Sequence, residues 1–435
     1  MKKIFLFSVI VTLQLNCSAQ SVMNADLKTR LDALADVEIT KVIEWRRDIH
    51  EHPELSNREV RTGALVADHL KKLGLEVKTG VAKTGVIGIL RGGKPGPVIA
   101  LRADMDALPV TERTDVPFKS IEKVQYNGAS TGVMHACGHD GHTAILMGVA
   151  EVLSQVKNDI AGTIVFLFQP AEEGAPKGEA GGACEMVKAG CLENPKVEAC
   201  FGLHVDASGP VGTIEYRPGG FMASSDAFSI VIKGKQTHGA MPWGGIDPIV
   251  IGAQIVNGLQ TIVSRMTPLT ETPAVVTVGS FNAGNRGNII PEEARMTGTI
   301  RCFDKKIQYQ IHENIRRMAT NIAEASGATA VVEIDISNPV TYNNPDLTAK
   351  MVPTFEEVAG KNKTMLVNAV TGAEDFAKYA EVVPSLFFDI GVRPVNKKME
   401  EAAPHHTPDF YMDESGFILG LKTFCHIVVD YAAKK

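Results

Sequence analysis

The side chains with the clearest chemical potential in this 435-residue chain lie between Gly132 and His142. Cys137 and His139 stand two positions apart there, and a thiolate and an imidazole are strong ligands for zinc-like ions. Glycines in the same stretch let the backbone turn tightly around an ion. The alternative is a glycine-rich turn with a buried cysteine and helix-capping polar residues, so this stretch alone leaves both interpretations open.

More candidate ligands follow segments that resemble strands. Asp104, the adjacent pair Glu172 and Glu173, and His204 each come shortly after an apolar run. Strands that alternate with helices predict an α/β sheet, and such sheets place their sites beyond the carboxyl ends of strands. Each side chain alone could be a solvated loop residue, but the repeated placement favours one shared site.

These side chains could together form a two-metal site. The candidates are Cys137, His139, Glu172, Glu173, His204 and His406. Such a site needs several anionic or imidazole ligands, one of them bridging, and a separate base for the water. Cys137 could bridge as a thiolate, and adjacent glutamates in a loop can point apart, one toward a metal and one toward a proton. Chemistry alone does not decide which glutamate is the base.

The strands that must position these residues show two patterns. Segments 84–90 and 96–101 predict two strands joined by a hairpin turn at Gly92 and Gly93. The run 162–168 is almost continuously apolar, which is typical of a strand buried on both faces.

A different pattern begins near residue 217. The predicted elements are a strand at 226–233, a helix at 247–264, strands at 274–281 and 294–303, a helix at 306–326 and a strand at 330–336. This βαββαβ order is that of a ferredoxin-like unit. It can fold as a lobe inserted between two parts of the first domain.

Composition limits the class of protein and its partners. The length predicts two domains, and 44% hydrophobic and 22% charged residues are ordinary for a globular protein. A formal net charge of -6 offers no basic surface, so no nucleic-acid partner is expected. After the N-terminal segment we expect no membrane-spanning run. The spacing of the cysteines other than Cys17 and Cys137 forms no recognisable disulfide framework.

Residues 1–19 predict a secretory signal peptide. Two lysines precede a mostly apolar run, and Cys17 and Ala19 are small residues at positions -3 and -1 of a cut before Gln20. We therefore expect export to a bacterial periplasm or to the medium. A lipid anchor through Cys17 is the alternative.

Five motifs occur in an order that resembles one enzyme family. They are RRDIHEHPEL at 46–55, RADMDALP at 102–109, MHACGHDGH at 134–142, QPAEEG at 169–174 and GLHV at 202–205. From about residue 40 onward the chain resembles the metal-dependent amidohydrolases of N-acyl amino acids, the group of hippurate hydrolases and plant auxin-conjugate hydrolases. The resemblance implies a metallopeptidase-like, two-domain hydrolase with two divalent ions, usually described with zinc, manganese or cobalt.

The resemblance also implies roles for single residues. The implied metal ligands are Cys137, His139, Glu173, His204 and His406. Glu172 matches the catalytic base, and the distance to Pro408 selects His406 over His405. Arg102 stands where related metallopeptidases have a ligand histidine, so His139 is expected to take over. Asp104 is then expected to orient a ligand, with a solvated turn aspartate as the alternative.

Further matches lie in the inserted lobe. The segment 237–242 resembles one whose histidine reaches the reacting carbonyl, often from a dimer partner, so His238 is the expected oxyanion donor. A surface histidine is the alternative. Asn288 and Arg301 fall near substrate-binding positions of the family. Trp243 replaces the usual second histidine, a departure that concerns substrate preference.

The predicted fold class is α/β, with a dimetal catalytic domain and an inserted ferredoxin-like lid of the dimerisation type. The predicted bounds are 1–19 for the signal peptide, 25–216 and 338–435 for the catalytic domain, and 217–337 for the lid. The expected reaction is hydrolysis of the amide bond of an N-acyl amino acid or related conjugate by a metal-activated water. The products are a carboxylic acid and an amino acid.

Three alternatives to this function are compatible with the same motifs. A dipeptidase or aminopeptidase-type metallopeptidase would use the same centre on another small-molecule substrate. A non-catalytic metal- or peptide-binding protein is disfavoured because Glu172 accompanies a full ligand set. A redox or nucleophilic Cys137 lacks a resolving cysteine beside it. A homodimer or higher homo-oligomer is compatible with each interpretation of the protein as an enzyme.

Overall fold

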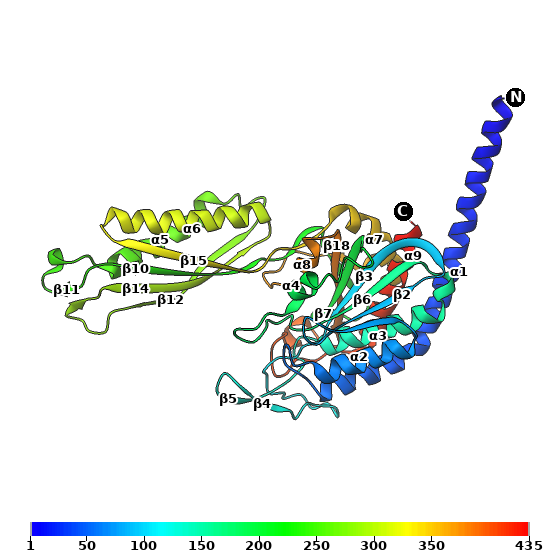
Figure 1. Cartoon of the computed structure of the whole chain (residues 1–435), viewed down its shortest axis with the longest axis horizontal. Coiled ribbons are helices and arrows are strands. Elements are labelled where there is room, and N and C mark those ends of the chain that lie inside the picture. Colours follow the sequence, from blue (N-terminus) through cyan, green and yellow to red (C-terminus); the bar gives the residue numbers. More distant parts are fainter. Residues whose placement is uncertain (1, 434–435) are drawn as a thin grey trace. The chain divides into compact units, whose positions relative to one another are not determined.

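The computed structural model describes residues 2–433, with side chains from residue 24 onward. The side chains of the predicted signal peptide, Cys17 among them, lie outside the described residues. The chain divides into two compact units, which can be followed by their labels in Figure 1. Unit 1 comprises Met1–Pro218, Asn343–Val367 and Lys378–Lys435, and unit 2 comprises Gly219–Tyr342 and Asn368–Ala377.

Unit 1 contains a mixed eight-stranded sheet with the order β1-β2-β6-β3-β7-β18-β8-β17. Its strands are β1 (Glu76–Val81), β2 (Gly85–Arg91), β3 (Lys94–Asp104), β6 (Ala161–Gln169), β7 (Ala199–Pro210), β8 (Ile214–Tyr216), β17 (Thr364–Leu366) and β18 (Ser385–Arg393). The central strands β6, β3, β7 and β18 run parallel. β6 is buried along nearly its whole length, as its continuous apolar run predicted, because both faces of the sheet are covered.

The hairpin predicted between 84–90 and 96–101 is wrong. β6 lies between β2 and β3, antiparallel to the first and parallel to the second. The turn between β2 and β3 crosses the start of β6 instead, where the Gly92 N–H donates to the Gly162 carbonyl at 2.9 Å. A two-glycine turn permits either path, and a strand from much later in the chain takes the central position.

In unit 1, the stretch that contains Cys137 and His139 leads into the N-terminus of a helix, α3. The helices of this unit are α1 (Lys2–Glu51), α2 (Val60–Lys72), α3 (His139–Gln155), α4 (Gly182–Lys188), α7 (Pro345–Ala359), α8 (Ala377–Ala380) and α9 (Phe417–Ala433). α3 packs against α1, α9 and β3. It starts directly after Gly138, whose φ of 102° is left-handed and where a Cβ would lie 2.3 Å from Val205 Cγ2. Glycine thus allows the helix start to approach β7 closely.

One helix of unit 1 combines length with an apolar composition. Among the described residues, Glu414–Ala433 is long and apolar enough to cross a bilayer by length and composition. No run of this length and apolar composition was expected after the N-terminal segment. However, 72% of its most apolar stretch is buried inside the protein, and α9 packs against α1, α3 and α7. An all-round apolar helix with this burial is typical of a core helix.

Unit 2 contains a four-stranded antiparallel sheet with the order β12-β14-β10-β15. Its main elements follow the chain order β10 (Ser225–Lys233), α5 (Pro248–Met266), β12 (Ala274–Ala283), β14 (Glu293–Cys302), α6 (Lys305–Ala325) and β15 (Thr329–Asn338). All six predicted elements are confirmed within a few residues. Asp247 and Asp304 cap the two helices by accepting backbone N–H groups at 2.8 and 2.9 Å.

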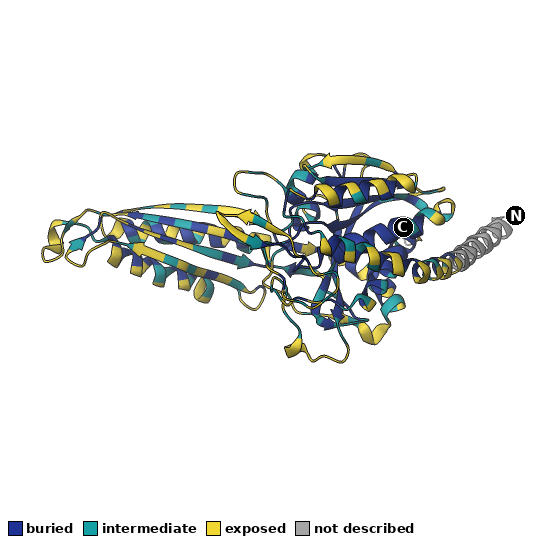
Figure 2. Cartoon of the chain, turned by 90° about the horizontal axis from the view of Figure 1, so that it is seen from below, coloured by how far each residue is buried: buried dark blue, intermediate teal, exposed yellow. Residues whose placement is uncertain are grey.

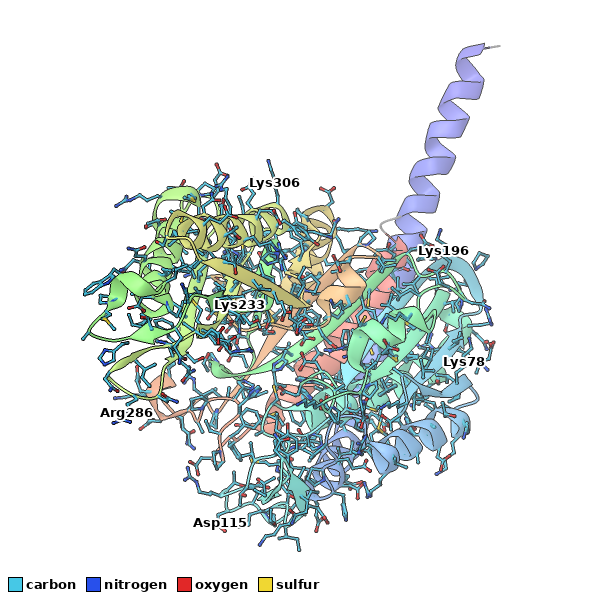
Figure 3. All side chains as sticks on the ribbon, turned by 60° about the vertical axis from the view of Figure 1, so that its left-hand side comes forward. Lys78, Asp115, Lys196, Lys233, Arg286 and Lys306 are labelled. Atoms are coloured by element: carbon cyan, nitrogen blue, oxygen red, sulfur yellow. The ribbon has the colours of Figure 1, made fainter. Side chains whose placement is uncertain are left out.

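The two sheets differ in burial (Figure 2). β10 alternates buried residues with half-buried and exposed ones, because α5 and α6 pack on one face of its sheet. Charged side chains such as Lys78, Asp115 and Lys306 are exposed and project from the surface in Figure 3. Buried charged and polar side chains are the exception, and in unit 1 many of them gather near the start of α3.

Candidate metal centre and active site

The predicted metal ligands meet around the Cys137 thiol. His204 Nε2 lies 3.3 Å and His406 Nε2 lies 3.4 Å from Cys137 Sγ. Glu173 Oε1 lies 3.1 Å from His406 Nε2 and 3.9 Å from His139 Nε2. The structure therefore brings all five predicted ligands together within unit 1.

Four segments supply these ligands. Cys137 and His139 flank the N-terminus of α3, and Glu173 lies in the turn after β6. His204 lies inside β7, which continues to Pro210, and so does not follow a strand end as expected. His406 has a φ of 63°, and its N–H donates to the Ala136 carbonyl at 2.8 Å. A non-glycine residue in the left-handed region is strained, and such residues cluster at functional sites.

Hydrogen bonds turn one nitrogen of two ligand histidines toward the cluster. His139 Nδ1 donates to the Asp106 carbonyl at 2.8 Å, and His204 Nδ1 donates to the Val205 carbonyl at 2.7 Å. In the neutral ring each Nε2 can then present a lone pair to the cluster, which is how ligand histidines are commonly oriented. His139 Nε2 is buried and makes no hydrogen bond among the described residues. A buried nitrogen without a partner costs about 1–3 kcal/mol, and a bound ion would relieve that cost.

His405 lies beside the cluster but has no lone pair to offer. Its Nε2 accepts the Ala207 N–H at 3.1 Å, and its Nδ1 donates to the Cys137 carbonyl at 3.1 Å. Burial lowers the pKa of His405 well below its usual range, so the ring stays neutral. These hydrogen bonds distinguish His405 from the adjacent His406, whose Nε2 faces Cys137 and Glu173.

Asp104 is fully buried and so is not a solvated turn residue. Its Oδ1 accepts from His142 Nδ1 at 2.7 Å, and its Oδ2 accepts from Arg102 Nη1 at 2.7 Å. His142 Nε2 in turn accepts the Val205 N–H at 2.9 Å, and burial lowers the pKa of His142 to about 3. Asp104 therefore orients a neutral histidine next to the ligands, and lies 3.8 Å from His139 Nε2.

The charges of the cluster favour a bound cation. Hydrogen bonds to Cys137 and Glu173 raise the pKa of His406 to about 10. Burial opposes a charge on His139, but Asp104 and Cys137 outweigh it and raise the pKa of His139 well above its usual range. Without an ion, protons occupy positions that a divalent cation could take. A thiol, three imidazoles and a carboxylate at these distances fit such a cation chemically.

Asp106, which no sequence pattern singled out, holds the turn with both glutamates. Its Oδ1 accepts the Glu172 N–H and its Oδ2 accepts the Glu173 N–H, both at 3.1 Å. The Ser56 hydroxyl donates to Oδ2 at 2.7 Å. The backbone of the turn is thereby fixed to the segment that also binds His139. The one sequence signal was its place two residues after Asp104 in the same motif.

The predicted lid residues lie in unit 2 and do not all come together. His238 is exposed in β11 (Thr237–His238), and the Ala240 N–H donates to His238 Nδ1 at 3.0 Å. The Gly239 N–H donates to the Asn288 carbonyl at 2.8 Å, which joins the two loops. Arg301 lies at the other end of β14 from the Asn288 loop. It donates to the side chain of Thr299 and the carbonyl of Ile300.

A shallow hollow accompanies the His238 loop. It has a volume of about 630 Å³ and is lined by Gly239, Pro242 and Arg286, among others. Arg286 is exposed and labelled in Figure 3. Trp243, beside Pro242, is 81% exposed.

Comparisons with known proteins agree with this centre. The model of Peptidase family M20/M25/M40 matches residues 100–430. The chain is 40% identical over 395 residues to thermostable carboxypeptidase 2 of Saccharolobus solfataricus, covering 90% of this chain and 96% of the relative. It is 43% identical over 308 residues to an N-acyl-L-amino acid amidohydrolase of Geobacillus stearothermophilus, covering 71% and 79%.

A solved structure extends the comparison to the whole fold. A Bacillus subtilis protein, described as a dinuclear metal binding peptidase from the M20 family, aligns with a TM-score of 0.76 and 36% identity. The alignment covers 91% of this chain and 98% of that one. Since sequence and fold both agree, the chain belongs to peptidase family M20/M25/M40, and it is a metal-dependent hydrolase.

Proposed function

We propose that this protein hydrolyses the amide bond of N-acyl amino acids or closely related conjugates, using two divalent metal ions. The observation that supports it most is the convergence of one thiol, three imidazoles and Glu173, with Glu172 next in the chain. The names of two relatives, an N-acyl-L-amino acid amidohydrolase and a carboxypeptidase, both denote hydrolysis of an amide bond next to an amino acid.

The residues of unit 1 would divide the work of holding the ions. Cys137 would be the central ligand, because both His204 and His406 contact its sulfur. His139 and Glu173 complete the set. When bound, divalent ions such as zinc, manganese or cobalt lower the pKa of a water molecule and polarise a carbonyl group. The dinuclear description of the structural relative supports two ions rather than one.

Glu172 is the proposed general base. Its carboxylate accepts a proton from the attacking water and delivers it to the amide nitrogen as the C–N bond breaks. The turn that holds Glu172 is fixed by Asp106, so the carboxylate can be held in position while Glu173 binds metal. Adjacent residues in a turn can point apart, which lets the pair serve two roles.

Unit 2 is the proposed ferredoxin-like lid, inserted between two parts of a catalytic domain as the sequence predicts. Its βαββαβ order and sheet order support this assignment. Because Ala240 donates to His238 Nδ1, the neutral ring has its hydrogen on Nε2. That N–H is suited to donate to the carbonyl oxygen as negative charge develops there. In a homodimer, the histidine could serve the site of the partner subunit.

Substrate recognition and export complete the proposal. Asn288 is the better supported of the two substrate-binding candidates, because its loop is joined to that of His238. The guanidinium of Arg301 is engaged within its own strand. Export through the signal peptide is supported by the two lysines and the apolar run at the N-terminus, with a lipid anchor through Cys17 as the alternative.

A substrate and metal screen tests this function. Purified protein loaded separately with zinc, manganese or cobalt would be assayed on N-acetyl, N-benzoyl and longer N-acyl amino acids. Free dipeptides and N-blocked dipeptides serve as the comparison set. We expect higher kcat/KM on the N-acyl amino acids. A preference for dipeptides with a free amine would favour the dipeptidase alternative, and a preference for N-blocked peptides would favour carboxypeptidase action.

A further inference from the structure

Three successive N–H groups of the glutamate turn donate to buried carboxylates. The Ala171 N–H donates to Glu59 Oε1 at 2.9 Å, and the next two N–H groups donate to Asp106. Successive N–H groups of this kind form a concave site for an anion. Here two side chains of the protein supply the negative charge, so this turn is fixed from two sides.

Ala171 needs this support because its backbone is strained. Its φ is 53°, in the left-handed region that disfavours residues with a Cβ. Residues remain in such conformations only when surrounding contacts hold them there. The Glu59 carboxylate contacts the N–H of Ala171 directly, one residue before the proposed base.

Glu59 is itself held firmly by hydrogen bonds. It is fully buried, and it also accepts the Asn57 N–H at 3.0 Å and the Thr84 hydroxyl at 2.6 Å. Burial, and secondarily the nearby Asp106, raises the pKa of Glu59 to about 7. A buried carboxylate is costly unless hydrogen bonds satisfy its oxygens. Its hydrogen bonds join the segments that contain Asn57, Thr84 and Ala171, and the last of these is the glutamate turn.

We propose that Glu59 is a positioning residue for Glu172: it holds Ala171 in the left-handed conformation that directs the glutamate pair toward the metal centre. The inference rests on the proposed role of Glu172 as the base. If Ala171 relaxes to a negative φ, the Ala171–Glu172 peptide must rotate relative to the Pro170–Ala171 peptide, which pulls the Glu172 N–H out of line with Asp106. The carboxylate of Glu172 would then shift relative to the substrate.

The length of the Glu59 side chain, and not its charge, is what holds Ala171 in place. Two variants separate these two properties. Glu59→Gln keeps the length, so its carbonyl oxygen can still accept from Ala171 and Asn57. Glu59→Asp keeps the carboxyl group but is one methylene too short to reach Ala171 and Thr84 together. We expect Glu59→Asp to lower kcat by roughly 10- to 100-fold, the scale of a misplacement of about 1 Å, with KM within about twofold. Glu59→Gln should stay within a few-fold of the wild type.

Glu54 provides a matched control. It also accepts two backbone N–H groups, those of Arg61 and Thr62 at 2.9 and 2.8 Å, but these belong to the first turn of α2. Glu54→Ala should therefore lower Tm while leaving kcat near the wild-type value. Metal content, measured by elemental analysis, should be unchanged in every one of these variants.

The possible outcomes are distinguishable. Equal kcat values for Glu59→Asp and Glu59→Gln would overturn the inference, as would a loss of metal that explains the loss of rate in Glu59→Asp. A folded Glu59→Ala protein with wild-type kcat would also overturn it. If Glu59→Ala does not fold, the Asp and Gln pair decides. An active Glu172→Gln variant would overturn the proposed base itself, and this variant is measured alongside so that the two failures are not confused.

Discussion

The metal centre in unit 1 and the His238 loop in unit 2 are built in opposite ways. Of the predicted ligands, Cys137 and His139 are buried, Glu173 and His204 are half-buried and His406 is exposed. Hydrogen bonds from several segments hold them, and Asp104 and Asp106 behind them are buried. His238 is exposed, and its imidazole accepts a hydrogen bond from within its own loop. The first region is preorganised within unit 1, whereas the second presents an exposed imidazole at the surface of unit 2.

This difference has an energetic consequence. The groups around the metal centre lose their freedom when unit 1 folds, so little ordering remains to be done when an ion or substrate binds. In the proposed function, the His238 loop would act only after the lobe closes over a substrate, and such closure would also exclude water. We therefore expect damage to the centre to abolish the reaction and damage to the loop to reduce it.

Removal of metal should have the largest effect. Exhaustive chelation should abolish activity, and zinc, manganese or cobalt should restore it, because no group of the His238 loop can replace the Lewis acid. Elemental analysis and turnover on one N-acyl amino acid provide the measurement. Full turnover by rigorously metal-free protein would contradict the proposed chemistry. Cys137→Ser should weaken metal binding, since a neutral hydroxyl is a poorer ligand than a thiolate.

The two glutamates should separate in their effects. Glu172→Gln should lower kcat by about 10²–10⁴-fold with metal retained, because an amide cannot take up the proton of the water. Glu173→Gln should also lose metal affinity. A Glu172→Gln rate within a few-fold of the wild type would show that the base is another residue.

The exposed histidine should have a smaller but clear effect. His238→Ala should lower kcat by roughly 10²–10³-fold, the range for loss of one oxyanion donor, with metal content unchanged. Mixing Glu172→Gln subunits with His238→Ala subunits tests whether the histidine serves a partner. Recovered activity in mixed dimers would support sharing. Inactive mixed dimers would exclude sharing, and a fully active His238→Ala protein would remove the residue from the mechanism.

Metal affinity should increase with pH. His406 in the metal-free protein has a pKa raised to about 10, so at pH 6–8 it is protonated and an ion must displace the proton. Each such proton makes the apparent affinity rise about tenfold per pH unit below the pKa. Competition titrations against a chelator at pH 6, 7 and 8 measure the slope. A flat profile would contradict the protonated state of the empty centre.

The smallest expected effect concerns the stability of the exposed loop. Trp243→Ala should change the free energy of unfolding by less than about 0.5 kcal/mol, since the indole is 81% exposed. Its kcat/KM ratios between aromatic and aliphatic acyl substrates should nevertheless change, because the residue is next to the His238 loop. Arg102→Ala is the contrasting variant: removal of a buried partner of Asp104 should cost about 3–5 kcal/mol. A Trp243→Ala variant with wild-type substrate ratios would exclude a role in selectivity.

Local sequence determined much of this protein. The types of the ligands, the adjacent glutamates and the six elements of unit 2 could all be predicted, because motif spacing and hydrophobic periodicity are properties of short segments. The resemblance of five motifs to one family added the roles, including the preference for His406 over His405. The hairpin at Gly92 and Gly93 was predicted wrongly for the same reason: a short segment does not reveal that β6 will lie between two neighbouring strands.

Tertiary structure alone decided which groups hold the centre in place. The ring nitrogens of His405 are both occupied by distant backbone groups, and Asp104 turned out to orient His142. Asp106 and Glu59 contact the glutamate turn from segments far away in the chain. Such contacts depend on hydrogen-bond partners that become neighbours when the sheet assembles, and no local pattern encodes them. The sequence therefore determined which side chains can bind the metal, and the fold determined which of their atoms face it.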